Sequence, residues 1–139
     1  MTKDITGIIT WLRGWFDDIY SAIGHSHRIA TFTTPTFSST YLSGTKHCYI
    51  HAVENIAVLD YYLPLQNIPT TDTTIISNIP NEYQAVGSNV QEIIIDTSGH
   101  KFLLTIDTSG HIMARAYSSS NSGGTVTGQI AYRCKGVTA

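Results

Sequence analysis

Short apolar segments of strand length recur from Lys46 to the C-terminus, and they constrain the fold more than any other feature of the chain. They are rich in Ile, Val, Thr and Tyr, and Gly, Pro, Asn and Asp stand between them. The segments are HCYIHAV, AVLDYYLPL, DTTIISNI, VQEIIID, HKFLLTID, HIMARAYS and VTGQIAYRC. A spacing of about ten residues with turn signals between strands is typical of all-β sandwiches and barrels. The sequence therefore predicts a mainly β fold with an antiparallel β-domain over residues 46–139.

The pentapeptide DTSGH occurs twice, at residues 96–100 and 107–111, each time after an isoleucine. Gly99 and Gly110 can adopt the left-handed conformation that a bulged hairpin turn needs. The repeat therefore predicts a three-stranded meander with two similar turns. The alternative is that each Asp and His form an acid/base or metal-binding pair. Successive turns lie at opposite ends of a meander, so the two copies cannot form one site within one chain.

The N-terminal segment carries a regular apolar stripe that predicts a helix over residues 1–24. The stripe residues are Ile5, Ile8, Leu12, Trp15, Ile19 and Ala22, with alternating spacings of 3 and 4. This spacing is the seam of a coiled coil. Packing of the helix on its own β-domain is the alternative, but strict spacing and large side chains favour self-association. Isoleucine in both seam columns favours trimers, although the sequence does not fix the number of chains.

The tetrapeptide GHSH follows this helix at residues 24–27. In an extended segment His25 and His27 point the same way, and beyond a parallel trimer they would face its axis. Six imidazoles would then surround one divalent ion such as iron, nickel or zinc. The Ser- and Thr-rich residues 28–45 that follow predict extended chain or short strand, so the HxH motif and a neck or linker together span 25–45.

Charge and cysteine content exclude several classes of protein. The net charge of −2 argues against a nucleic-acid surface, which needs a basic stripe. No run of 18 apolar residues is present, so we expect no membrane insertion. Cys48 and Cys134 are too few for a disulfide framework. We expect free buried thiols, with a disulfide as the alternative if the first and last strands are neighbours.

No catalytic motif is recognisable, and the residues around Cys48 do not form one. In a strand, His47, Tyr49 and His51 share one face, while Cys48 and Ile50 share the other. The two histidines would lie about 13 Å apart, too far to share a metal ion. We therefore assign Cys48 to the core and the histidines to a surface or interface. The chain also lacks paired carboxylates, which argues against a hydrolytic spike domain.

The order of these segments resembles that of trimeric phage tail-fibre and receptor-binding proteins. In such fibres HxH motifs coordinate iron on the threefold axis, and His25 and His27 match that motif. Three stretches resemble the head domains of small siphophage receptor-binding proteins: LPLQNIPTTDTTIISNIPNEY, TSGHKFLLTIDTSGHIMARAYSSS and GGTVTGQIAYRC. The brief helix and the neck without repeats depart from long fibres.

This resemblance implies three regions: a trimerisation helix over 1–24, a neck over 25–45 and a β-sandwich head over 46–139. It implies a homotrimer at the tail tip of a virion, in contact with other tail proteins. It also implies attachment to a host cell-surface saccharide without catalysis. The alternative is a structural tail or baseplate connector whose β-domain binds another virion protein.

Saccharide sites combine aromatic rings for stacking with polar groups for hydroxyls. The candidates for such a site are Tyr61, Tyr62, Tyr117, Asp107, His111 and Arg115, with Tyr83 and Tyr132 as further tyrosines. The alternative for each tyrosine is a half-buried strand residue that packs across strands.

Overall fold

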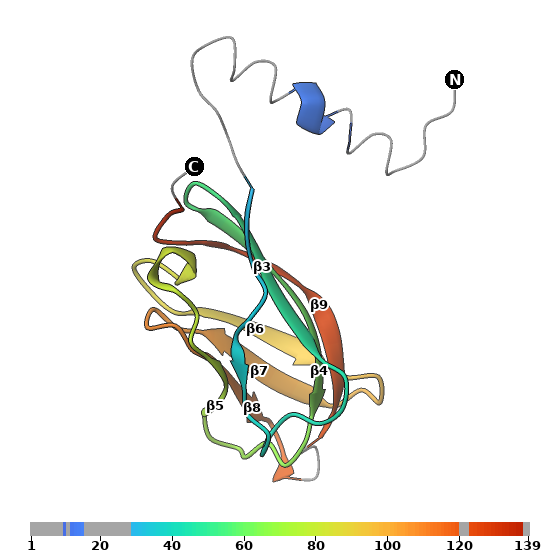
Figure 1. The fold of residues 1–139 in the computed structure, drawn as a ribbon. Coiled ribbons are helices and arrows are strands. Elements are labelled where there is room, and N and C mark those ends of the chain that lie inside the picture. The colour runs from blue at the N-terminus through green and yellow to red at the C-terminus, as the bar shows by residue number, and fades with distance from the viewer. Residues whose placement is uncertain (1–9, 11, 16–28, 120–122, 138–139) are drawn as a thin grey trace, which may run out of the picture.

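The structure, a computed structural model, describes residues 10, 12–15, 29–119 and 123–137. These residues form two antiparallel sheets (Figure 1). The first has the strand order β1-β3-β4-β9 and the second the order β2-β5-β8-β7-β6. The elements are β1 (Ala30–Phe32), β2 (Thr36–Phe37), β3 (His47–Val53), β4 (Ile56–Leu65), β5 (Thr73–Ser77), the 3-10 helix η1 (Asn81–Tyr83), β6 (Val90–Ile95), β7 (Lys101–Ile106), β8 (Ile112–Ala116) and β9 (Gly124–Arg133).

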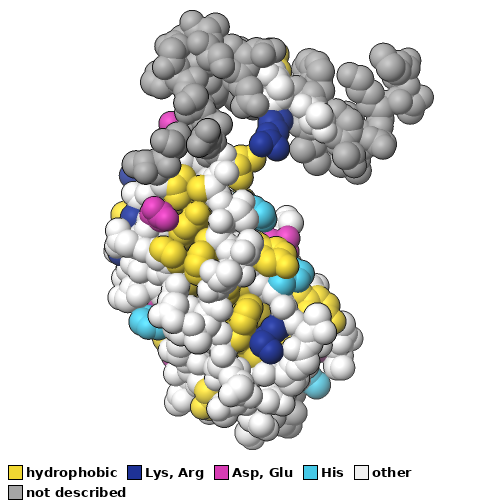
Figure 2. Space-filling view, in the orientation of Figure 1, with side chains coloured by type: hydrophobic (Ala, Val, Ile, Leu, Met, Phe, Trp, Pro, Cys, Tyr) yellow, Lys and Arg dark blue, Asp and Glu magenta, His cyan; other side chains and the backbone are white. Residues whose placement is uncertain are grey.

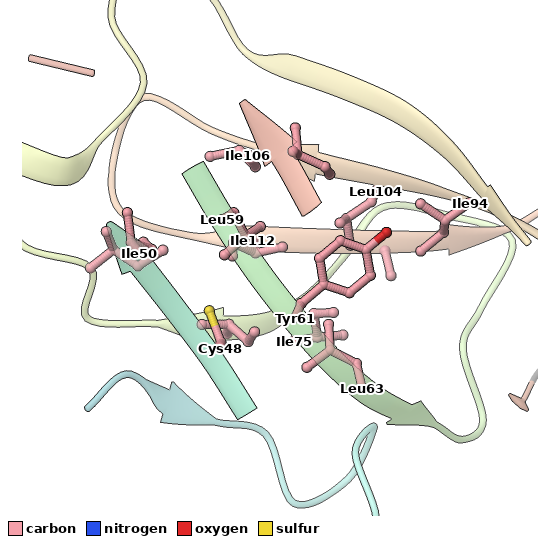
Figure 3. Close-up of a cluster of buried hydrophobic side chains, with 14 of the residues drawn as sticks. Cys48, Ile50, Leu59, Tyr61, Leu63, Ile75, Ile94, Leu104, Ile106 and Ile112 are labelled. Carbon is pink, nitrogen blue, oxygen red and sulfur yellow. The ribbon is translucent and has the colours of Figure 1, made fainter. Parts of the chain in front are cut away.

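The two sheets share one hydrophobic core. Along β3 and β4, buried and more exposed residues alternate, as the pleat of a strand requires. Figure 3 shows side chains from both sheets meeting in this core. The residues labelled there are Cys48, Ile50, Leu59, Tyr61 and Leu63 from the first sheet and Ile75, Ile94, Leu104, Ile106 and Ile112 from the second. Each sheet therefore has an inner apolar face and an outer face.

The strands expected from the sequence are present, and the meander is confirmed. Each of the seven expected segments overlaps one strand from β3 to β9. Strand β7 pairs with β6 on one side and with β8 on the other. The two DTSGH turns therefore lie at opposite ends of β7. Cys48 and Cys134 are buried and free, so the expectation of thiols is also confirmed.

The expected neck contributes to both sheets. Strand β1 pairs with β3, and β2 pairs with β5. Leu42 is 2% exposed and belongs to the core cluster. Residues 30–42 therefore pack with the β-domain, because Leu42 belongs to its core and Phe32, Phe37 and Tyr41 pack against that core.

Only part of the expected helix lies within the described residues. Thr10 and residues 12–15 are helical, and Leu12 and Trp15 are 40% and 49% exposed. The other stripe positions, Ile5, Ile8, Ile19 and Ala22, lie outside the described residues, as do His25 and His27. In the described part of the chain, no helix is long and apolar enough to cross a membrane.

Candidate functional site: an aromatic patch on the outer face of the first sheet

The outer face of the β1-β3-β4-β9 sheet carries a compact group of aromatic and polar side chains. Strand pairing places His47 opposite Tyr62 and Tyr49 opposite Asp60. The pairing of β4 with β9 adds Thr127 beside Tyr62 and Gln129 beside Asp60. We call these residues the outer patch: His47, Tyr49, Asp60, Tyr62, Thr127 and Gln129. They form two rows of three, His47–Tyr62–Thr127 and Tyr49–Asp60–Gln129.

The imidazole of His47 packs against both tyrosine rings of the outer patch. Its centroid lies 4.7 Å from that of Tyr49, with 10° between the ring planes. The Tyr62 centroid lies 6.0 Å away at 26°. Tyr49 and Tyr62 remain 38% and 40% exposed. In the space-filling view, histidine, hydrophobic and acidic side chains lie next to one another on the side where β3 and β4 run (Figure 2). The three rings are thus held in place and still accessible.

Asp60 supplies the only carboxylate of the outer patch. Its side chain is 35% exposed, and its Oδ1 accepts a long hydrogen bond of 3.4 Å from His47 Nε2. An ionised carboxylate has about four lone-pair sites. Among the described residues this is the only hydrogen bond of the carboxylate, so most of its lone-pair sites have no partner there. A ligand with several hydroxyl groups can use that capacity.

Tyr61, a candidate from the sequence, lies in the core and is only 4% exposed. Its hydroxyl lies over Gly128, the residue opposite it on β9. A Cβ at position 128 would lie 2.8 Å from the Tyr61 hydroxyl, so the glycine makes room for the ring. Tyr61 is therefore unavailable for stacking on a saccharide. The same holds for Tyr83 and Tyr132, which are each 6% exposed.

Asp107 and His111 form a hairpin turn at the end of β7. Asp107 Oδ1 accepts hydrogen bonds from the backbone N–H groups of Ser109 (2.9 Å) and His111 (2.8 Å). His111 Nδ1 lies 3.0 Å from Asp107 Oδ2 and donates to it. These contacts are those of a side chain that stabilises a turn. The interpretation of the repeat as turn chemistry is confirmed.

The first copy of the repeat has the same contacts. Asp96 Oδ1 accepts from the N–H groups of Ser98 and His100, both at 2.8 Å. His100 Nδ1 donates to Asp96 Oδ2 at 2.8 Å. Each aspartate is occupied by its own turn, while the side chains of His100 and His111 remain 36% and 42% exposed.

Arg115 and Tyr117 lie on the outer face of the other sheet. Arg115 is opposite Leu103, and its Nε lies 3.9 Å from Asp72 Oδ1. Tyr117 is 51% exposed. Because the two outer faces are on opposite sides of the core, neither residue joins the outer patch. The six candidates from the sequence are thus separated, and of these Tyr62 alone belongs to the patch.

Neither a reactive thiol nor a metal cluster accompanies the outer patch. Burial, with a smaller contribution from the nearby Asp60 carboxylate, raises the pKa of Cys48 to about 12. Such a thiol stays protonated at neutral pH and is a poor nucleophile. Within the described ranges, no group of three or more His, Cys, Asp or Glu residues could hold a metal ion.

Strand alternation in the sequence could have placed Tyr62, Asp60 and His47 on outer faces. Choosing candidates by residue type alone did not use that signal. Neighbouring residues of a strand point to opposite faces, so Tyr61 and Tyr62 cannot both be outside. Asp60 and Tyr62 must share a face, as must His47 and Tyr49. The contribution of β9 had no comparable signal, because it depends on pairing between distant segments.

Comparison of the sequence with known protein-family models and with curated proteins finds no match.

Proposed function

We propose that this protein is a phage tail receptor-binding protein that attaches, as a homotrimer and without catalysis, to a saccharide on the host cell surface. In this proposal the described β-domain is a head of β-sandwich type. The observation that carries the proposal is the outer patch, in which three oriented rings and an accessible carboxylate lie together on one outer face.

Aromatic rings and a polar rim suit a sugar better than they suit most other ligands. One face of a pyranose ring is lined by C–H groups, which pack on aromatic carbon, while its hydroxyls hydrogen-bond at the edge. Tyr49 and Tyr62 supply the rings, and Asp60 supplies the acceptor. A rigid platform loses little conformational entropy when the ligand binds.

Weak sites of this kind attach strongly when they are repeated. Three linked heads raise the effective concentration of the second and third contacts, so adhesion can exceed the affinity of one site by a factor of about 10² or more. The N-terminal stripe supports trimerisation. The imidazoles of His25 and His27 are suitable ligands for a divalent ion that would secure the assembly.

Binding to an array of bacterial surface glycans tests the proposal. We expect the full chain to bind some of these glycans, and Tyr62→Ala and Tyr49→Ala each to weaken binding by about tenfold, because loss of a central aromatic contact costs about 1.4 kcal/mol or more. The variant Tyr117→Ala changes a residue on the outer face of the second sheet, so its effect on binding shows which of the two outer faces holds the site. Loss of binding in Tyr117→Ala but not in Tyr62→Ala would place the site on the second sheet.

A structural connector in a tail or baseplate is the second candidate function. The outer face of the second sheet favours it, since Ile93 and Ile95 on the edge strand β6 are 56% and 57% exposed. Exposed apolar residues on an edge strand are typical of contacts with another protein. An absence of glycan binding, with loss of virion assembly in an Ile93→Thr/Ile95→Thr variant, would support the connector.

A further inference from the structure

The charges around the outer patch restrict the kind of saccharide it can take. Asp60 occupies the middle of its row, with Tyr49 on one side and Gln129 on the other. The central strand β4 thus presents the carboxylate between a ring and an amide. Whatever lies on the patch must contact this carboxylate or bury it.

No lysine or arginine belongs to the outer patch: Lys46 has other partners, and Arg133 lies farther along the same face. Lys46 Nζ donates to the Gly44 carbonyl at 3.2 Å and lies 5.7 Å from the centroid of the Phe37 ring. Arg133 pairs with Ile56, two cross-strand rows beyond Asp60. A carboxylate or phosphate placed on the patch would therefore face the like charge of Asp60 with no lysine or arginine of the patch to offset it, which is unfavourable.

The polar atoms of the outer patch match hydroxyl groups instead. The Asp60 carboxylate accepts hydrogen bonds, and a charged acceptor forms stronger bonds to hydroxyls than a neutral one does. Gln129 and Thr127, both exposed on β9, can donate as well as accept. Adjacent hydroxyls of a sugar ring can donate to the carboxylate and accept from the amide at the same time.

The outer face of the second sheet differs from the outer patch because it carries basic side chains. Lys101 and Arg115 both lie there, on neighbouring strands. Although Asp72 lies 3.9 Å from Arg115 and offsets part of its charge, an anionic polymer would be repelled less by that face than by the outer patch. This contrast gives a testable difference between the two faces of one molecule.

We propose that the outer patch binds a pyranose residue that carries no negative charge. One apolar face of the sugar ring packs on the aromatic rings, and two adjacent hydroxyls hydrogen-bond to Asp60 and Gln129. This inference rests on the proposed function, because it names the class of saccharide that the same site accepts. Neutral hexoses and amino-bearing hexoses both satisfy it, whereas uronic acids and phosphorylated sugars do not.

Isothermal titration of the full chain with matched oligosaccharides tests this inference. The set consists of one neutral oligohexose, its amino-bearing analogue, and analogues with a ring carboxylate or a phosphate ester. We expect the neutral and amino-bearing ligands to bind and the two anionic ligands to bind at least tenfold more weakly. The Asp60→Asn variant should lose about tenfold in affinity for the neutral ligand and discriminate less against the anionic ones.

Two further variants separate this effect from a loss of folding. Gln129→Ala should weaken binding of the neutral ligand, and Glu82→Gln, an exposed charge change on η1, should leave it unaltered. Tighter binding of an anionic ligand, or unchanged affinity in Asp60→Asn, would overturn the inference while leaving the attachment function in place. If the folded protein binds no saccharide in this set or on the glycan array, the proposed function fails as well.

Discussion

At the scale of single residues, Asp96 and Asp107 belong to identical motifs but differ in how deeply their side chains are buried. Their side chains accept the same pattern of hydrogen bonds. The Asp96 side chain is 0% exposed, whereas that of Asp107 is 15% exposed. A buried acceptor that loses a partner cannot recover it from water, so its hydrogen bonds have more effect on stability.

The substitution Asp96→Asn should therefore destabilise the fold more than Asp107→Asn. Asparagine keeps one oxygen for the backbone N–H groups but loses the charged acceptor for the histidine. We expect Asp96→Asn to lower the free energy of unfolding by about 1–3 kcal/mol. We expect Asp107→Asn to lower the free energy of unfolding by less. Urea denaturation of both variants measures the difference. Equal losses would show that burial does not distinguish the two turns.

The same two carboxylates should make stability depend on pH in the acid range. Burial alone would raise the pKa of Asp96 and of Asp107, but it is outweighed in each by hydrogen bonds, chiefly from His100 and from His111. The pKa of each folded-state carboxyl is thus lower than in the unfolded chain. The stabilisation is present above about pH 4 and is lost as the pH falls through the folded-state pKa values.

Thermal unfolding between neutral pH and pH 2 measures this effect. The wild-type chain should lose stability below about pH 4. An Asp96→Asn/Asp107→Asn variant should have a flatter profile, because it no longer has these groups to protonate. A profile of the same steepness in the variant would assign the acid sensitivity to other carboxylates.

At the scale of elements, the two glycines of the repeat have different surroundings. Gly99 has φ +86° and nothing within 4 Å of the position where a Cβ would lie. Gly110 has φ +93°, and a Cβ there would lie 2.7 Å from the carbonyl oxygen of Ile79. Both positions favour glycine for conformational reasons, but only the second also lacks space.

Gly110→Ala should consequently be more disruptive than Gly99→Ala. The left-handed conformation costs an alanine about 1–2 kcal/mol at either position. At Gly110 the clash adds to this cost, because the turn packs against the backbone that leads into η1. Chemical denaturation should give a lower midpoint for Gly110→Ala, and similar midpoints would contradict the packing seen at Ile79.

The strands from β3 to β9 were predictable because each carries its own pattern of apolar residues between turn residues. Strands β1 and β2, with only 3 and 2 residues, were expected only as extended chain or short strand within a neck, without partners. Such short strands are defined by their partners, β3 and β5, rather than by a pattern of their own. The candidate site follows the same rule: the side-by-side placement of His47 and Tyr62 requires the register between β3 and β4.

At the scale of the whole molecule, the path of the chain decides which residues meet. Strand β9 completes the outer patch, although the four strands β5 to β8 of the second sheet separate it from β4 in the sequence. Pairing over such a sequence distance cannot be inferred from local patterns. The proposed homotrimer is also a property of this scale, and the proposal is based on the sequence of the N-terminal stripe and on His25 and His27.

Native mass spectrometry with and without a strong chelator should detect the proposed assembly. We expect the mass of three chains plus one divalent ion, because in the proposed assembly the stripe would bring the chains together and the imidazoles would bind the ion. The variant His27→Ala should lose the ion, and a serine control, Ser26→Ala, should retain it. A metal-free monomer would remove the support for a tail-fibre arrangement.

The alternation of β3, β4 and β9 also has an evolutionary consequence. Every residue of the outer patch stands next to core residues along its own strand, such as Cys48 between His47 and Tyr49. A substitution on the outer face therefore changes what the surface recognises and leaves the core packing intact. In the proposed role, a virus whose host alters its coat could regain adhesion through single codon changes, with no need to rebuild the scaffold.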